Sequence, residues 1–170
     1  MTPEIKTANE LIDSTLDARW TERRHGPHAE MLRCVLRAFV EHGGPVTVNT
    51  VATAFPAWPA ARIRSHLEAL DQNDLIVLAG DTVQFAYPFS ASPTPFAVTF
   101  SNGQERFACC ATDALGIAAM LGARIHISSR CHQSGERLEL DVDPTGPLDA
   151  SDVMVWVGKG ASGGRACTGL

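Results

Sequence analysis

FAVTFSNGQERFACCATDALGIAAMLG, residues 96–122, predicts a β-hairpin that runs directly into a helix. An Asn-Gly pair at 102–103 separates two short apolar segments, which is typical of a hairpin. Small and apolar residues then run from Cys110 to Leu121, and Gly122 is a common helix terminator. This stretch therefore predicts a sheet that carries one helix.

The residues after this helix predict further antiparallel strands. Residues 124–131 alternate, and their parity turns Cys131 toward the core as a structural thiol. Residues 138–142 alternate in a partner strand, and residues 153–157 predict a short apolar strand. The last residues, 158–170, are rich in glycine and small side chains and predict a flexible, unpaired tail.

The sequence before residue 87 is organised differently. A helix is predicted from Glu30 to the glycine pair at 43–44, because its apolar residues share one helical face: Leu32, Val35, Leu36, Phe39 and Val40. A short second helix is predicted after Thr47 or Asn49, either of which can cap it. A third helix is predicted from Pro59 to Asn73, and residues 75–85 predict a hairpin.

We therefore expect an α+β protein. Its N-terminal three-helix winged-helix-like unit precedes a small mixed β-sheet domain with one motif-bearing helix. The expected boundaries are 1–29 for an N-terminal helix or linker, 30–86 for the winged-helix-like unit, 87–95 for a Pro-rich linker and 96–170 for the sheet domain.

Composition excludes several classes of protein. The 170 residues are 45% hydrophobic and 19% charged, which excludes a disordered chain. No apolar run is long enough to span a membrane and no signal peptide is evident, so we expect a cytoplasmic location with free thiols. The net charge of −5 argues against a nucleic-acid binder, and the expected recognition helix offers only Arg62 and Arg64.

The spacing of Cys110 and Asp113 points to thiol chemistry. Residues three apart share a helix face, and the partial positive charge of a helix start favours a thiolate there. A carboxylate beside the thiol can accept its proton and return it elsewhere. By spacing alone, plain packing of Cys110 remains an alternative, as does a vicinal disulfide or shared metal with Cys109. No cysteine or histidine pair has zinc-finger spacing.

Together these motifs resemble the organomercurial (alkylmercury) lyase family over roughly residues 30–160. The family pattern of aromatic, Ala, variable, Cys, Ala, variable, Asp corresponds to Phe107–Asp113. A strand that ends in Ser-Ser-x-Cys corresponds to Ser128–Cys131. A turn glycine and an alternating strand that runs into proline correspond to Gly135–Pro144.

The resemblance implies a fold, a reaction and three site residues. Cys110 would be the mercury-binding nucleophile, Asp113 the proton carrier and Cys167 the second catalytic thiol, with mercury held by Cys110 and Cys167. Cys131 would be structural. The implied reaction cleaves a carbon–mercury bond of a small organomercurial and yields a hydrocarbon and Hg(II). No cofactor is implied; small thiols or a mercuric reductase would accept Hg(II), and neither nucleic acid nor membrane would be a partner.

Two other functions remain open at the level of sequence. One is a non-enzymatic protein that binds a soft metal through Cys109, Cys110 and Cys167. The other is a metal-responsive winged-helix transcription regulator, although residues 30–86 carry four arginines and no lysine against six acidic residues. Release of hydrocarbon from an organomercurial would distinguish a lyase from both.

Overall fold

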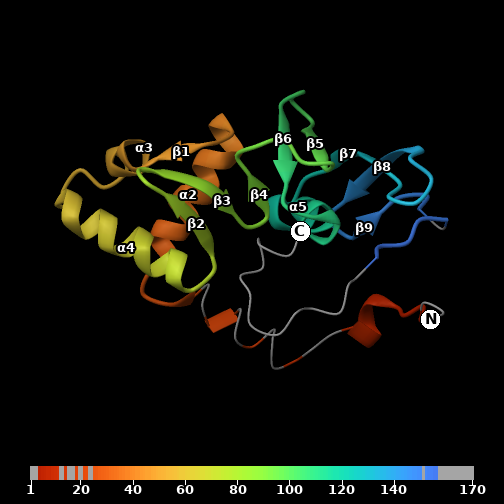
Figure 1. Ribbon diagram of the computed structural model, residues 1–170, viewed down its shortest axis with the longest axis horizontal. Coiled ribbons are helices and arrows are strands. Elements are labelled where there is room, and N and C mark those ends of the chain that lie inside the picture. The colour runs from red at the N-terminus through yellow and green to blue at the C-terminus, as the bar shows by residue number, and fades with distance from the viewer. Residues whose placement is uncertain are drawn as a thin grey trace.

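The computed structural model describes residues 4–11, 14, 18, 21–22, 25–150 and 152–156 (Figure 1). Its helices are a 3-10 turn η1 (Ala8–Leu11), α2 (Ala29–His42), α3 (Val48–Thr53), α4 (Ala60–Gln72) and α5 (Ala111–Leu121). Its strands are β1 (Val46–Thr47), β2 (Ile76–Ala79), β3 (Thr82–Ala86), β4 (Phe89–Ser90), β5 (Ala97–Phe100), β6 (Glu105–Ala108), β7 (Ile125–Arg130), β8 (Arg137–Asp143) and β9 (Gly146–Pro147). The mixed α+β fold expected from the sequence is confirmed.

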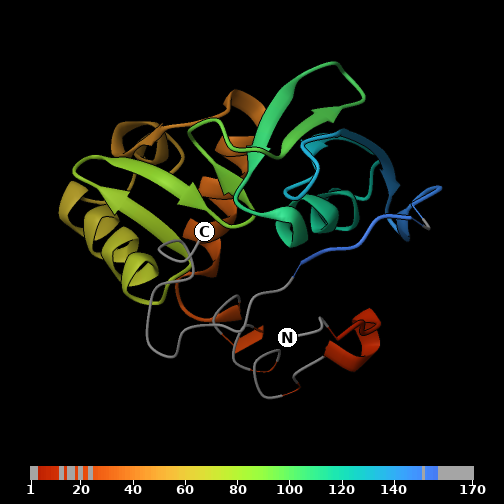
Figure 2. The same cartoon turned by 45° about the vertical axis from the view of Figure 1, so that its right-hand side comes forward.

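The helices α2, α3 and α4 lie with the β2–β3 hairpin at one end of the molecule (Figures 1 and 2). The helix predicted from Glu30 is present, and its Val35 and Phe39 are almost fully buried. Thr47 is the residue that caps α3, because its hydroxyl oxygen accepts the backbone N–H of Thr50 at 3.0 Å. The helix predicted from Pro59 to Asn73 is α4, with those two residues as its caps.

One antiparallel sheet runs through the described residues, in the order β1-β3-β4-β6-β5-β7-β8-β9, with β2 paired to β3. The segment expected to be a Pro-rich linker contributes β4, which pairs with both β3 and β6. Phe89 of β4 is fully buried, and its ring stacks on that of Phe39 in α2 at 6.2 Å. Burial of this aromatic pair supplies the reason that the segment is held in the sheet.

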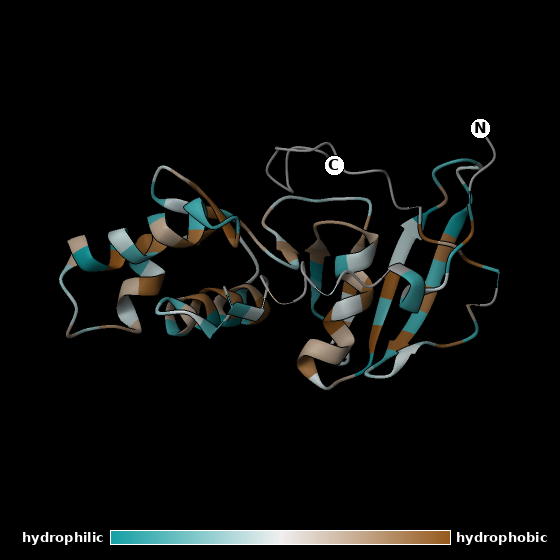
Figure 3. Cartoon of the chain, turned by 90° about the horizontal axis from the view of Figure 1, so that it is seen from below, coloured by the Kyte–Doolittle hydropathy of each residue, from teal (hydrophilic) through white to brown (hydrophobic). Residues whose placement is uncertain are grey.

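The helix α5 covers one face of the sheet at the other end of the molecule. Its apolar residues Ala114, Ile117 and Ala118 are buried, as are Ile125 and Ile127 of β7. Side chains alternate between the two faces of a strand, and Figure 3 shows hydrophilic and hydrophobic bands along the long strands. The opposite face of β7 and β8 therefore carries polar side chains.

Near its C-terminal end the chain departs from the expected structure. The strand predicted over residues 153–157 is wrong for residues 153–156, which are irregular, and Val157 lies outside the described residues. Met154 and Trp156 are 73% and 79% exposed, so apolar composition alone did not bring them into the sheet. Most of residues 1–24 and the tail 158–170 also lie outside the described residues. Within the described part, no helix is long and apolar enough to cross a membrane.

Candidate active site

The sheet delivers Cys110 to the first turn of α5. The strand β6 ends at Ala108, whose N–H donates to the carbonyl of Phe96 at 2.9 Å. The next N–H, that of buried Cys109, donates to the carbonyl of Pro88 at 2.9 Å. Cys110 follows in an extended conformation, at φ −150° and ψ 178°, as the N-cap of α5. Hydrogen bonds on the strand side and the helix side therefore both hold the position of Cys110.

A thiol–carboxyl contact lies at this helix start. The thiol of Cys110 donates to Oδ2 of Asp113 at 3.0 Å, and the backbone N–H of Asp113 donates to Sγ of Cys110 at 3.4 Å. The carboxylate of Asp113 also accepts a hydrogen bond from the Cys110 backbone. This reciprocal pattern is a capping box with Cys and Asp in the places usually held by Ser or Thr and Glu. The side-chain pairing expected from the three-residue spacing is confirmed.

Burial sets the protonation behaviour of this pair. Burial raises the pKa of the Cys110 thiol, and the Asp113 carboxylate raises it further, while backbone N–H groups of α5 oppose the shift. Burial also raises the pKa of Asp113, against hydrogen bonds from Cys110 that lower it. Both shifts favour the protonated form of each group, and the Cys110 thiol donates to a carboxyl group of increased basicity, which in its ionised form can receive the thiol proton.

The other cysteines fall into three environments. Cys109 is 4% exposed, and it does not form a vicinal disulfide with Cys110. Cys34 is half-buried on α2, where burial raises the pKa of its thiol. Cys167 lies outside the described residues. Across the described part of the chain, no group of three or more His, Cys, Asp or Glu residues is placed to hold a metal ion.

The expected position of Cys131 in the core is wrong. The strand β7 ends at Arg130, so the alternation that would turn Cys131 inward stops one residue short. Cys131 is half-buried in a turn, where its N–H donates to the carbonyl of Glu136 at 2.8 Å. Hydrogen bonds from the side chain and backbone of Ser134 to the sulfur lower the pKa of its thiol. Cys131 therefore belongs to the β7–β8 turn and not to the core.

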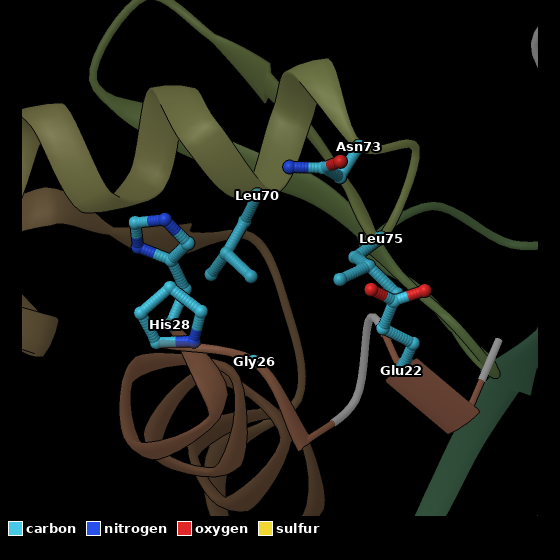
Figure 4. A pocket seen from close by; sticks show the side chains of 7 residues that line it. Glu22, Gly26, His28, Leu70, Asn73 and Leu75 are labelled. Carbon is cyan, nitrogen blue, oxygen red and sulfur yellow. The ribbon is translucent and has the colours of Figure 1, made fainter. Parts of the chain in front are cut away.

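Two hollows lie away from the Cys110–Asp113 pair. One, of about 390 Å³, lies between the start of α2 and the end of α4 (Figure 4); its lining residues are Glu22, Gly26, Pro27, His28, Leu70, Asn73 and Leu75. The other, of about 260 Å³, is lined by Pro95, Ser128, Ser129, Arg130 and Arg137. Neither contains Cys110 or Asp113, so the site is defined by its reactive pair and not by a cavity.

Sequence reasoning missed a polar network on the open face of β7 and β8. Its centre is His126, which lies 3.0 Å from Asp141 and 2.7 Å from Glu139 through its two ring nitrogens. Hydrogen bonds to Asp141 and Glu139 raise the pKa of His126. Hydrogen bonds from Ser128, which makes the larger contribution, and from His126 lower the pKa of Glu139 to about 2. The register of β7 and β8 places His126 directly opposite Asp141. Pairing the two predicted strands in this register would have revealed the network.

The fold and the pair together define a class of protein. A half-buried cysteine begins a helix on an antiparallel sheet, and a carboxyl group within hydrogen-bond distance can carry its proton. These are the parts of a cysteine-nucleophile protein with an adjacent general acid or base.

Comparison with known proteins narrows this class to one family. Residues 89–169 match the family model described as alkylmercury lyase. The chain is 28% identical over 145 residues to an alkylmercury lyase of Bacillus cereus, covering 82% of this chain and 62% of that protein. It is 31% identical over 114 residues to an alkylmercury lyase of Staphylococcus epidermidis, covering 67% of this chain and 50% of that one. Residues 89–169 therefore belong to the alkylmercury lyase family, as the sequence motifs indicated.

A solved structure shows the same fold. The mercury-bound form of MerB2 superposes with a TM-score of 0.63 at 22% identity, covering 80% of this chain and 66% of that one. The chain spans less than two thirds of the length of the Bacillus cereus relative.

Proposed function

We propose that this chain is a carbon–mercury lyase that cleaves small organomercurials by protonolysis through Cys110, Asp113 and Cys167. The observation that carries the proposal is the 3.0 Å hydrogen bond from the Cys110 thiol to Asp113, within the segment that matches the alkylmercury lyase family. Mercury is soft and prefers thiolate ligands, so a thiol with its own proton acceptor suits this substrate.

The first step binds the substrate. A cation R–Hg⁺ bonds to Sγ of Cys110 and displaces the thiol proton. Oδ2 of Asp113 is the nearest acceptor for this proton, and burial increases the basicity of the Asp113 carboxylate. The product of this step is Cys110–S–Hg–R.

The second step breaks the carbon–mercury bond. Asp113 first releases to water the proton that it received from Cys110. It then takes the proton of the Cys167 thiol, and the resulting thiolate adds to mercury. Two thiolates increase the electron density on mercury and weaken its bond to carbon. The protonated Asp113 then gives its proton to the leaving carbon, which yields R–H and Hg(II) bound by Cys110 and Cys167.

Small thiols or a mercuric reductase would accept Hg(II) and restore the free thiols. The sequence of steps needs no organic cofactor, since the proton comes from the thiols and is carried by Asp113. Exchange between thiolates is the chemistry that moves Hg(II) onward, because each acceptor offers the same kind of soft ligand.

For the three-helix end of the molecule we infer a winged-helix-like scaffold that does not read DNA. Arg64 is engaged by Asp81 at 2.6 Å and by Glu68 at 3.0 Å. The Arg62 guanidinium lies 3.9 Å from the centre of the Trp58 ring. Phosphate binding would require these cations to exchange partners they already have.

The test is hydrocarbon release from an aryl mercurial. The purified chain is incubated with phenylmercuric acetate and excess small thiol; benzene is measured by gas chromatography and bound mercury by elemental analysis. Wild type and the control Cys34→Ser should release benzene, whereas Cys110→Ser and Cys167→Ser should not. Stoichiometric mercury binding without benzene would favour the non-enzymatic soft-metal protein. Unchanged release by Cys167→Ser would make Cys109 the candidate second ligand.

A further inference from the structure

Arg106 of β6 connects the strand that leads to Cys110 with the end of a distant helix. Its Nε donates to the carbonyl of Phe39 at 2.8 Å, and its Nη2 donates to the carbonyl of Val40 at 2.6 Å. Its Nη1 donates to the carbonyl of Glu105 at 2.7 Å. The acceptors are two of the last four carbonyls of α2; that of Phe39 also accepts the backbone N–H of the C-cap Gly43 at 3.0 Å, and that of Val40 lies beyond the last intrahelical donor.

The guanidinium of Arg106 bonds to backbone carbonyl oxygens and, in the part of the chain that the structure describes, is not paired with a carboxylate. Among the ion pairs of the described residues, none includes Arg106, and burial lowers the pKa of its guanidinium. The partial negative charge at the C-terminus of α2 favours a cation there. Because hydrogen bonds depend on direction, these bonds fix β6 relative to the end of α2. Moving either element would leave N–H groups of the Arg106 guanidinium without acceptors.

A second contact joins the same two parts of the molecule. Phe39, whose carbonyl accepts from Arg106, stacks its ring on Phe89 of β4 with an interplanar angle of 7°. Phe89 is paired in the sheet with Ala108, the last residue of β6. The first contact therefore ends on β6 and the second on β4, the strand paired with it, and both meet β6 within four residues of Cys110.

We infer that Arg106 is a positioning residue for the Cys110–Asp113 pair, and that the three-helix end of the molecule acts on the site through it. This inference rests on the proposed lyase function only for its catalytic readout. Cys110 and Asp113 are half-buried where β6 meets α5. Without the link to α2, the end of β6 gains freedom, the thiol and carboxyl separate, and water reaches both groups.

The test uses the full chain with Arg106→Leu, Arg106→Lys and the control Arg124→Leu. Arg124 is a second arginine of the same sheet region, but it is exposed and pairs with Asp141. The first readout is the rate of Cys110 alkylation by iodoacetamide as a function of pH, followed on the Cys110 peptide by mass spectrometry. The second is kcat and KM for benzene release.

In Arg106→Leu the alkylation midpoint should move to lower pH, because burial no longer raises the pKa of Cys110. Its kcat should fall roughly tenfold with KM little changed, since a small misplacement of reacting groups is costly. Faster alkylation of Cys110 together with slower cleavage would indicate that the Cys110–Asp113 pair is misplaced. A smaller amount of active protein would slow cleavage without speeding alkylation. Arg106→Lys, which keeps one cationic donor, should fall between, and Arg124→Leu should match wild type.

An unchanged alkylation profile in folded Arg106→Leu would overturn the inference. If that variant does not fold, Arg106→Lys decides by the same two readouts, and a wild-type profile there would also overturn it. If wild type releases no benzene, the proposed function fails, while the alkylation comparison still decides the role of Arg106.

Discussion

Asp113→Asn separates mercury binding from proton delivery. The amide oxygen can still accept from the Cys110 thiol and from its backbone N–H, so the cap of α5 is kept. The amide cannot take up and return a proton. We therefore expect a folded protein that binds the organomercurial but releases almost no hydrocarbon.

The expected size of the loss follows from the role of Asp113. A positioned acid or base contributes about 10²–10⁴-fold in rate. Each factor of ten is about 1.4 kcal/mol of barrier, so the loss is roughly 3–6 kcal/mol. The free energy of unfolding should change by less than about 1 kcal/mol, because an amide oxygen at this N3 position of the capping box can still accept from the backbone N–H of Cys110. The negative charge that raises the pKa of Cys110 is also removed, so alkylation of Cys110 at neutral pH should become faster.

The assay is a single turnover with phenylmercuric acetate. Benzene release gives the rate of protonolysis, elemental analysis gives the mercury bound, and thermal unfolding reports on the cap. Glu136→Gln is a matched control, because it neutralises an exposed acid of the β7–β8 turn. Equal losses of binding and cleavage, or a large drop in melting temperature, would refute the reasoning and make Asp113 structural.

Three further predictions address the rest of the molecule. Cys110→Ser should abolish benzene release with an unchanged melting temperature, because serine caps a helix well. Cys110→Ala should also abolish release and lose about 1 kcal/mol of stability. Cleavage at the wild-type rate in either variant would contradict the assignment. The raised pKa of His126 means that the folded state holds its proton more tightly, so its small stabilisation is present below pH 6.5 and lost as the pH rises through the folded pKa. Wild type should therefore exceed His126→Gln in melting temperature at pH 6 and lose that advantage at pH 9; a pH-independent difference would argue against it. Cys131→Ala should cost less than about 1 kcal/mol in urea unfolding, because its side chain lies in a turn, and a loss near 3 kcal/mol would return it to the core.

The reactive pair could be predicted from sequence because it is local. Cys110 and Asp113 lie three residues apart, so any helix that starts at Cys110 brings their side chains together. The two hairpins and the helix ends at Pro59, Asn73 and Gly122 were also predictable, since turn and capping preferences act over a few residues. The motif around the pair was specific enough to indicate the family.

Only the tertiary structure decided what surrounds that pair. Strand alternation did not reveal that β7 ends before Cys131, nor composition that Phe89 would be paired in the sheet. Arg106 reaches carbonyls 66 and 67 residues earlier in the chain, a contact that no local preference encodes. The burial that raises the pKa values of Cys110 and Asp113 is likewise a sum over distant segments. Local spacing thus determines which groups meet, whereas the packing of remote elements determines how far water reaches them and how they hold a proton.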